Sequence, residues 1–539
     1  MKKIHRHLLT PSIVACCGVL GWWAARDFEK VVAKRPGAPE IKERVVTKAS
    51  SRRVRTVVND EYRNGTTVEI FGSIDEDEVI LRFPSAESYA AFLFALVGSK
   101  IHLIDQIDRL RAVRIGYDDW ADLAHLLDGE NIATYDSLPT FPVPSPASTS
   151  NQTGLVEFGE SLLPWLGITG DNSRWGAGVT IAVLDTGIIA HPALPGFFQS
   201  IAVTPFPSDI TKTNGHGTAV ASLIAGNDPL VTGVAPAARL ISVRVGDDSG
   251  RADAFALAAG ILAAVDAGAQ IINISMGTTE NNPLIEEAVL YANDRHVLIV
   301  AAAGNSEQAD ACYPAAYPSV ISVGAVDARG EHLDFSNFGT YLSLTAPGYA
   351  INAAWPNNQY AKISGTSASA PIVTGAIAAT MSNGRGVTMT ASQAAEIVMQ
   401  YSNEAGIPGP DSEYGVGILN VGRVMNRNTS GMVDAAITQQ RMIRSGRSGT
   451  SHEIQVTVQN RGTTVLSNTH LEVKTPYGSR RFNATTLVPG AFQTFSFPVR
   501  LSGLTAKLPI PVSSSISLSG LGHDVSPQNN QRTEALYVR

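Results

Sequence analysis

Four nearly continuous apolar runs alternate with helical patterns in the middle of this 539-residue chain. The runs lie at 179–185, 238–245, 269–276 and 297–304. The helical patterns cover 216–225, 252–267 and 284–293. Strands that are apolar along their whole length are buried on both faces, which requires helices on both sides of a parallel sheet. The sequence therefore predicts an α/β, doubly wound and mostly parallel sheet, and such sheets bind ligands beyond the carboxyl ends of their strands.

Asp185 and His216 stand at the ends of two of these elements. Asp185 closes the first apolar run, so its carboxylate lies at the exit of a buried strand, where it needs a partner. His216 begins a helical pattern of small residues and is flanked by Gly215 and Gly217, which permit a close approach of other groups. We expect this imidazole and this carboxylate to form a pair.

Ser367 is the third candidate. It begins a helix, with Gly365 before it and Pro371 in the first turn, where proline is tolerated. A serine hydroxyl becomes a useful nucleophile only when a base lies within hydrogen-bond reach and a carboxylate holds that base in the right tautomer. With Asp185 and His216, Ser367 would complete the set of groups that nucleophilic acyl transfer requires.

Such chemistry also needs donors for the oxyanion that develops on the attacked carbonyl. The backbone N–H of Ser367 at a helix start is one candidate. The side-chain amide of Asn305 is the second, because it follows the apolar run 297–304 and should lie at the same edge of the sheet.

Three sequence blocks carry a resemblance to a known family. They read AVLDTGI around Asp185, NGHGTAVASLIAG around His216 and SGTSASAPIVTGAIA around Ser367. Together they resemble the signature blocks of the subtilisin-like serine peptidases (the S8, or subtilase, family), over roughly 165–425. The resemblance implies a subtilisin-like fold and a serine endopeptidase that hydrolyses protein substrates through an acyl-enzyme on Ser367.

The same resemblance implies further site residues. A strand segment made of Ser275, Met276 and Gly277 would pair with an extended peptide substrate through backbone hydrogen bonds. The other wall of the side-chain pocket would be formed by Ala301, Ala302, Ala303 and Gly304.

The amino terminus has the features of an export segment. A basic start at 1–7, with Lys2, Lys3 and Arg6, precedes an apolar run at 8–25. The chain is therefore expected to be exported, either secreted or tethered to the membrane through 8–25. Trp22 and Trp23 slightly favour retention, and the tetrad that ends at Cys16 is a loose lipidation site.

The region before the predicted sheet divides into three parts. Residues 26–67 are charged and show no sustained period, so they are interpreted as a tether. Residues 68–137 show the order β-α-β-β-α-β of a small α+β unit, which resembles the inhibitory propeptide of the family. The Pro- and Ser-rich stretch 138–155 predicts an exposed linker and processing region of a self-processing zymogen.

The rest of the chain divides in the same way. The peptidase domain is assigned to 156–428, a linker to 429–450, and a β-sandwich to 451–539, where apolar and polar residues alternate around Ile454 and Phe495.

Composition excludes some function classes. A formal net charge of -7 gives no basic field for a phosphate backbone, so no nucleic-acid partner is expected. No acidic cluster has the spacing of a calcium loop, so no cofactor is evident and a structural calcium ion would have no motif to support it.

Two alternative functions make different demands on the sequence. An α/β-hydrolase esterase would need Gly-x-Ser-x-Gly and a nucleophile that precedes the acid and the histidine, whereas Ser367 comes last. A non-catalytic peptide-binding scaffold of the same fold is the main alternative, and it would be expected to lack one of the catalytic groups, all of which are present.

Overall fold

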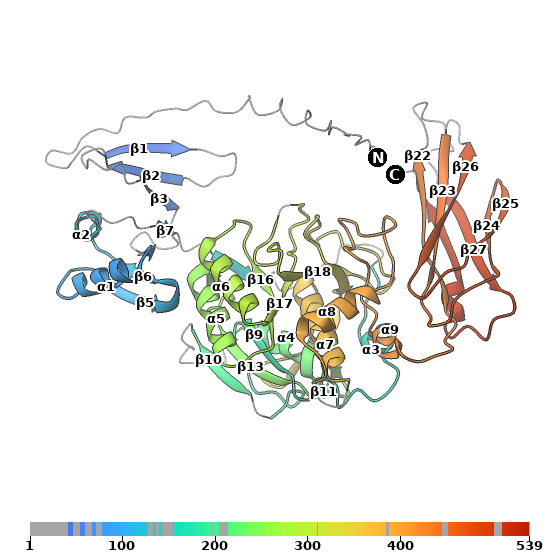
Figure 1. Cartoon of the computed structure of the whole chain (residues 1–539), viewed down its shortest axis with the longest axis horizontal. Coiled ribbons are helices and arrows are strands. Elements are labelled where there is room, and N and C mark those ends of the chain that lie inside the picture. The colour runs from blue at the N-terminus through green and yellow to red at the C-terminus, as the bar shows by residue number, and fades with distance from the viewer. Residues whose placement is uncertain are drawn as a thin grey trace, which may run out of the picture. The chain divides into compact units, whose positions relative to one another are not determined.

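The structure is a computed structural model of the chain (Figure 1). It describes residues 41–46, 54–59, 67–71, 78–127, 133–135, 139–142, 155–196, 198–203, 214–309, 311–383, 387–444, 451–500 and 509–537. The chain forms two compact units, Met1–Asp136 and Ser137–Arg539. The expected export segment 8–25 lies outside the described residues. Among the helices that are described, none combines the length and the apolar character needed to cross a membrane.

The first unit contains a small α+β fold. Its antiparallel sheet has the order β5-β6-β4-β7, with strands β4 (Glu78–Arg82), β5 (His102–Ile107), β6 (Ala112–Gly116) and β7 (Ala133–Tyr135). The helices are α1 (Ala86–Ala95) and α2 (Trp120–Leu126). Ser85 and Asp119 accept hydrogen bonds from the first turns of these helices, which fixes where each begins. From Glu78 to Tyr135 the elements follow the order that the sequence predicts, and a further strand at Thr67–Phe71 precedes them.

The interpretation of 26–67 as a tether does not hold over 41–46 and 54–59, which form strands. Strands β1 (Ile41–Val46), β2 (Val54–Asn59) and β3 (Thr67–Phe71) form an antiparallel sheet in the order β1-β2-β3. Each strand places valine or isoleucine between charged or polar residues. β-favouring residues, here valine, isoleucine, threonine and phenylalanine, make up half or more of each strand, but charged residues interrupt them, so no segment shows a sustained alternation.

The centre of the second unit is a seven-stranded sheet in which every neighbouring pair is parallel. Its order is β10-β13-β9-β15-β17-β18-β19. The strands are β10 (Gln199–Ala202), β13 (Arg239–Arg244), β9 (Thr180–Asp185), β15 (Ile271–Ile274), β17 (Leu298–Ala302), β18 (Val320–Val326) and β19 (Leu344–Pro347). The four apolar runs thus form four adjacent strands, and the predicted α/β fold class is confirmed.

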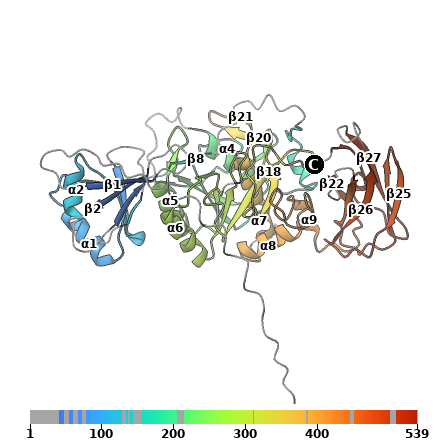
Figure 2. The ribbon, with the colours of Figure 1, turned by 90° about the horizontal axis from the view of Figure 1, so that it is seen from above.

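Helices cover both faces of this sheet (Figure 2). One face carries α5 (Ala254–Asp266) and α6 (Pro283–Asp294), and the other carries α4 (His216–Ala225), α7 (Thr366–Ser382) and α8 (Ala391–Gln400). Helix α7 is buried along its whole length because it packs against both the sheet and α4. Small residues allow this: a Cβ atom at Gly375 would lie 2.8 Å from Cβ of Val234.

Two antiparallel sheets form the carboxyl-terminal sandwich. The first has the order β22-β23-β26 and the second β25-β24-β27-β28. The strands are β22 (Ala435–Arg444), β23 (Ser451–Asn460), β24 (Thr469–Thr475), β25 (Gly478–Asn483), β26 (Phe492–Arg500), β27 (Ile510–Leu518) and β28 (Gln531–Leu536). Val456, Leu471, Val473 and Val512 pack in the core between them.

The predicted linker 429–450 is therefore incorrect over 435–444, where β22 pairs with β23. A register shift between Ile437 and Gln439 breaks the alternation, and Gln440 is buried although it is polar. A strand with a bulge and polar inward residues has no clear period of two.

The sandwich is hydrogen-bonded to the peptidase-like part of the same unit. Arg423, in the short helix α9 (Val421–Asn426), donates from Nε to the carbonyl oxygen of Arg461 at 3.2 Å. The backbone N–H of Glu404 donates to Oε1 of Gln459 at 3.0 Å. Arg423, Glu404 and Gln459 are buried, so the contact belongs to the folded interior of the unit.

The Pro-rich stretch 138–155 is expected from its sequence to be an exposed linker, but its residues 139–142 form a strand. Strand β8 (Pro139–Pro142) pairs antiparallel with β14 (Ala252–Asp253) and with β16 (Met276–Gly277). Proline lacks only the N–H, so it fits a strand wherever no donor is needed.

Candidate active site

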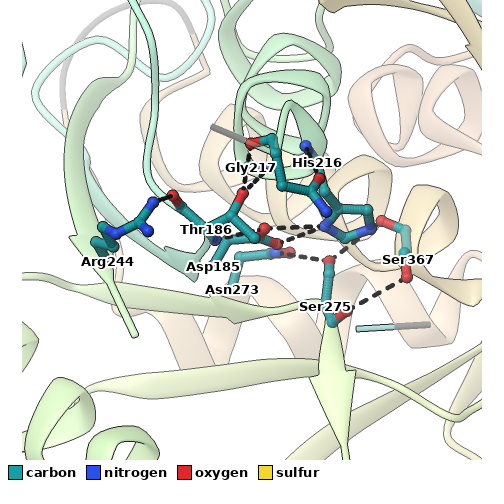
Figure 3. A network of polar contacts seen from close by, with 9 residues as sticks. Asp185, Thr186, His216, Gly217, Arg244, Asn273, Ser275 and Ser367 are labelled. Atoms are coloured by element: carbon teal, nitrogen blue, oxygen red, sulfur yellow. Dashed lines mark hydrogen bonds and ion pairs between the residues drawn. The ribbon is translucent and has the colours of Figure 1, made fainter. Parts of the chain in front are cut away.

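Asp185 and His216 form a buried pair at the carboxyl end of the sheet (Figure 3). Asp185 is the last residue of β9, and both of its carboxylate oxygens lie 2.9 Å from Nδ1 of His216. Its Oδ1 also accepts the backbone N–H of Thr186 at 2.7 Å. The parallel neighbours β13 and β15 hold the strand end in place. The expected pair therefore exists.

Gly217 makes this approach possible, and Gly215 permits a second close contact of the same helix start. A Cβ atom at Gly217 would lie 2.5 Å from the carbonyl oxygen of Gly187 and 3.1 Å from Cβ of Asp185. A Cβ atom at Gly215 would lie within 2.8 Å of the indole of Trp355. Helix α4 thus approaches the loop after β9 more closely than a side chain would allow.

The environment of His216 sets the basicity of its imidazole. Burial lowers the pKa of His216, whereas the negative charge of Asp185 and the hydrogen bond to it raise this pKa. The two effects of Asp185 together exceed the effect of burial. The pKa of His216 is therefore above its ordinary value. The ring can hold a proton well because the carboxylate beside it stabilises the charged form.

Ser367 lies in the first turn of α7, after Gly365, which has a φ of 124° that favours glycine. Figure 3 draws Ser367 within the network of polar contacts that includes His216 and Ser275. The Ser367 hydroxyl donates to the carbonyl oxygen of Ser275 at 3.3 Å. Ser275 directly follows β15, the strand that pairs with the one ending in Asp185. The fold thus gathers all three candidates at one edge of the sheet.

Asn305 lies next to the start of the same helix. Its Oδ1 accepts the backbone N–H of Thr366 at 3.0 Å and the Thr366 hydroxyl at 2.9 Å. Because the oxygen is committed to Thr366, the amide nitrogen of Asn305 is left as the donor of this side chain. Thr366 is not among the site residues predicted from the sequence, although it directly precedes Ser367.

Two further residues support the pair and were also missed. Thr186 donates from its hydroxyl to the carbonyl oxygen of Asn214 at 3.0 Å and accepts the N–H of Gly217 at 3.1 Å. The buried Arg244 donates to the carbonyl oxygen of Thr186 at 2.6 Å. A charged residue inside the apolar run 238–245 was the signal that could have identified Arg244.

The segments expected to bind a peptide have the following surroundings. Met276 and Gly277 form β16 and pair with β8. Ala301, Ala302, Ala303 and Gly304 are buried at the end of β17, and the N–H of Gly304 donates to the Thr366 hydroxyl at 3.1 Å.

Cys312 packs beside these segments. Its Sγ would lie 2.5 Å from a Cβ atom at Gly277, and burial raises the pKa of the thiol to about 12. It is a neutral packing group. In the part of the chain that is described, no group of three or more His, Cys, Asp or Glu side chains could hold a metal ion.

Comparisons with known proteins point to one family. Residues 176–417 match the Subtilase family. The thermostable alkaline protease of Halalkalibacterium halodurans is 38% identical over 272 residues, which cover 48% of this chain and 73% of that protein. Subtilisin BL of Lederbergia lenta is 40% identical over 205 residues, which cover 38% of this chain and 76% of that protein.

Among solved structures, the prenylagaramide maturation protease PagA matches 47% of this chain and 95% of its own at 31% identity, with a TM-score of 0.42.

Proposed function

Because this chain belongs to the subtilase family of serine peptidases, we propose that it is an exported endopeptidase, made as a self-processing zymogen, that cuts protein substrates through an acyl-enzyme on Ser367. The observation that carries the proposal is the buried Asp185–His216 pair at the carboxyl end of the sheet, with Ser367 bonded to Ser275 at the same edge.

In the proposed reaction His216 is the general base. Its Nδ1 is held by Asp185, so Nε2 is the atom that takes the proton from the Ser367 hydroxyl as Oγ attacks the substrate carbonyl. The same proton then passes to the leaving amine, which frees the new amino terminus. Water repeats the sequence and releases the acyl group. Asp185 stabilises the imidazolium that forms at each step.

Two donors would stabilise the oxyanion. One is the backbone N–H of Ser367 in the first turn of α7, where N–H groups have no intrahelical partner. The other is the amide nitrogen of Asn305, whose orientation Thr366 fixes. Such donors act by being in position before the charge develops.

The pairing of β8 supports the zymogen proposal. Pro142 lies opposite Met276, and Phe141 lies opposite Gly277, so a segment of the chain itself takes the place of an added substrate strand. β8 follows the α+β unit that we assign as an intramolecular inhibitor. Self-cleavage within about 136–160 would separate the α+β unit from the peptidase domain, and a cut after Pro142 would release β8 as well. Export, with secretion or membrane tethering through 8–25, remains part of the same proposal.

The proposal is tested with a fluorophosphonate probe, which phosphonylates an activated serine. The full chain should be labelled at Ser367, whereas Ser367→Ala should not be labelled and should persist as the unprocessed precursor. Ser369→Ala is the matched control, because its buried hydroxyl on the same turn bonds to the carbonyl oxygens of Ala346 and Pro347. A folded chain without labelling would favour the non-catalytic scaffold.

A further inference from the structure

The backbone carbonyl of Ser367 lacks its usual helical partner. In an α-helix this oxygen would accept the N–H of the residue four positions later, but that residue is Pro371, which has no N–H. Ser367 is almost fully buried, so water cannot readily take this place. Instead, the side-chain hydroxyl of Ser275 donates to the Ser367 carbonyl oxygen at 3.1 Å.

The direction of the Ser275 hydroxyl is set by a second buried group. Asn273, on β15, donates from Nδ2 to Oγ of Ser275 at 3.1 Å. Because Oγ accepts this bond, its own proton is available for Ser367. If the Asn273 amide were turned over, its oxygen would face Ser275 and compete for that proton.

A third residue holds the amide in this orientation. Thr374, one turn beyond Pro371 on α7, donates from its hydroxyl to Oδ1 of Asn273 at 2.9 Å. The side chains of Thr374, Asn273 and Ser275 are all fully buried. The hydrogen bonds therefore run in one direction, from Thr374 through Asn273 and Ser275 to the carbonyl of Ser367.

We propose that Asn273 and Thr374 are positioning residues, which direct the Ser275 hydroxyl onto the Ser367 carbonyl. They would thereby hold Ser367 in place beside the segment 275–277 that is expected to pair with the substrate. The connection works both ways across the site, because the Ser367 hydroxyl in turn donates to the carbonyl oxygen of Ser275. Two bonds then join the same two residues. Loss of one lets the start of α7 shift relative to β15. This inference rests on the proposed role of Ser367.

The test uses a double-mutant cycle in protein produced from the full chain. Ser275→Ala removes the donor, and we expect about a tenfold loss in kcat and in the rate of fluorophosphonate labelling, with little change in KM. Pro371→Ala supplies a new N–H at the position that an α-helix uses. The Ser275→Ala/Pro371→Ala protein should therefore recover most of the lost labelling rate.

Thr374→Val should lower the labelling rate in the same direction, and Thr374→Ser, which keeps the hydroxyl, should restore it. Thr380→Val is the control on the same helix, since its hydroxyl bonds within α7, to the carbonyl oxygen of Ala376. All rates are normalised to folded protein by circular dichroism.

The inference is overturned if Ser275→Ala and Thr374→Val lower only the melting temperature, or if Pro371→Ala gives no recovery. Failure of the unmodified chain to label would instead overturn the proposed function.

Discussion

Gly217 and Gly187 meet so closely that a side chain cannot stand between them: a Cβ atom at residue 217 would lie 2.5 Å from the Gly187 carbonyl oxygen. Gly187 is in the turn that follows Asp185, and Gly217 follows His216. The short distance between the Asp185 carboxylate and the His216 imidazole therefore depends on two residues that have no side chain. Relief of a clash here must move backbone, because the obstacle is a carbonyl oxygen and not a flexible side chain.

Gly217→Ala should consequently reduce activity, although the side chains of Asp185, His216 and Ser367 are all still present. We expect kcat to fall by about a hundredfold, the size of effect that a displacement near 1 Å produces. Steady-state kinetics on a peptide substrate measures it. Gly170→Ala is the matched control, because nothing lies within 4 Å of a Cβ atom there. Equal kcat values for the two variants would show that the close approach is not needed.

The dependence of activity on pH should report the pKa of His216. Activity requires the neutral imidazole, so kcat/KM should rise with pH through a pKa above the ordinary value of 6.5. In Asp185→Asn the burial that lowers the pKa of His216 remains, but the negative charge that raised this pKa is lost. The pKa should then fall, and the acidic limb should move to lower pH, while the plateau drops roughly ten-thousandfold. If the acidic limb of the Asp185→Asn profile stayed at the same pH, the charge of Asp185 would not be what raises the pKa of His216.

Asn305→Asp should separate transition-state binding from substrate binding. The change keeps the oxygen that accepts from Thr366 but removes the amide N–H, and it places negative charge beside a developing oxyanion. We expect kcat to fall by ~10²–10³-fold, as for loss of such a donor in a subtilisin, with KM nearly unchanged. A rise in KM with kcat intact would mean that Asn305 binds substrate in its ground state.

Glu404 should make stability depend on pH. Burial raises the pKa of Glu404 to about 7, partly offset by the Gly409 N–H, while Asp411 raises it further. Between the ordinary value of 4.5 and about 7 the folded state holds a proton that the unfolded state has lost. The free energy of unfolding should therefore fall by up to about 3 kcal/mol as the pH rises through this window.

Glu404→Gln should remove that decline and should be the more stable protein at pH 8. Urea unfolding at several pH values measures it, with Glu413→Gln, an exposed carboxyl of the same loop, as the control. If the free energy of unfolding changed with pH in the same way in Glu404→Gln and in the unchanged chain, Glu404 would not be the cause of the decline.

The sequence predicted the parts of this protein whose signals are local. The apolar runs gave the four central strands, and the contexts of Asp185, His216 and Ser367 gave their places at the strand and helix ends. The supporting network was not predicted, because Thr374 and Asn273 are 101 residues apart and only the fold brings them together.

The errors have a common physical origin as well. Strands β1, β8 and β22 contain charged, proline or buried polar residues, and they are strands because of what they pair with. Pairing partners are tertiary information, which periodicity within a single segment does not contain.

The composition of the segment that begins in β8 restricts where the proposed self-cleavage can occur. Residues 141–147 read FPVPSPA, so every peptide bond in this run has proline on one side. Proline before a cut bond has no N–H for backbone pairing with the expected substrate-binding segment 275–277, and proline after it makes a tertiary amide with a restricted backbone. The run should therefore resist cleavage, and the mature amino terminus should lie outside 142–147, within the proposed processing region of about 136–160. Amino-terminal sequencing and intact mass measure it.

Pro144→Ala tests the same argument from the other side, because it creates two bonds free of proline, the one after Val143 and the one before Ser145. New amino termini at 144 or 145 are expected in this variant. A mature terminus inside 142–147 in the unchanged chain would show that proline does not protect the run, and β8 would then be a substrate that the enzyme cuts readily and not a strand that keeps the site occupied.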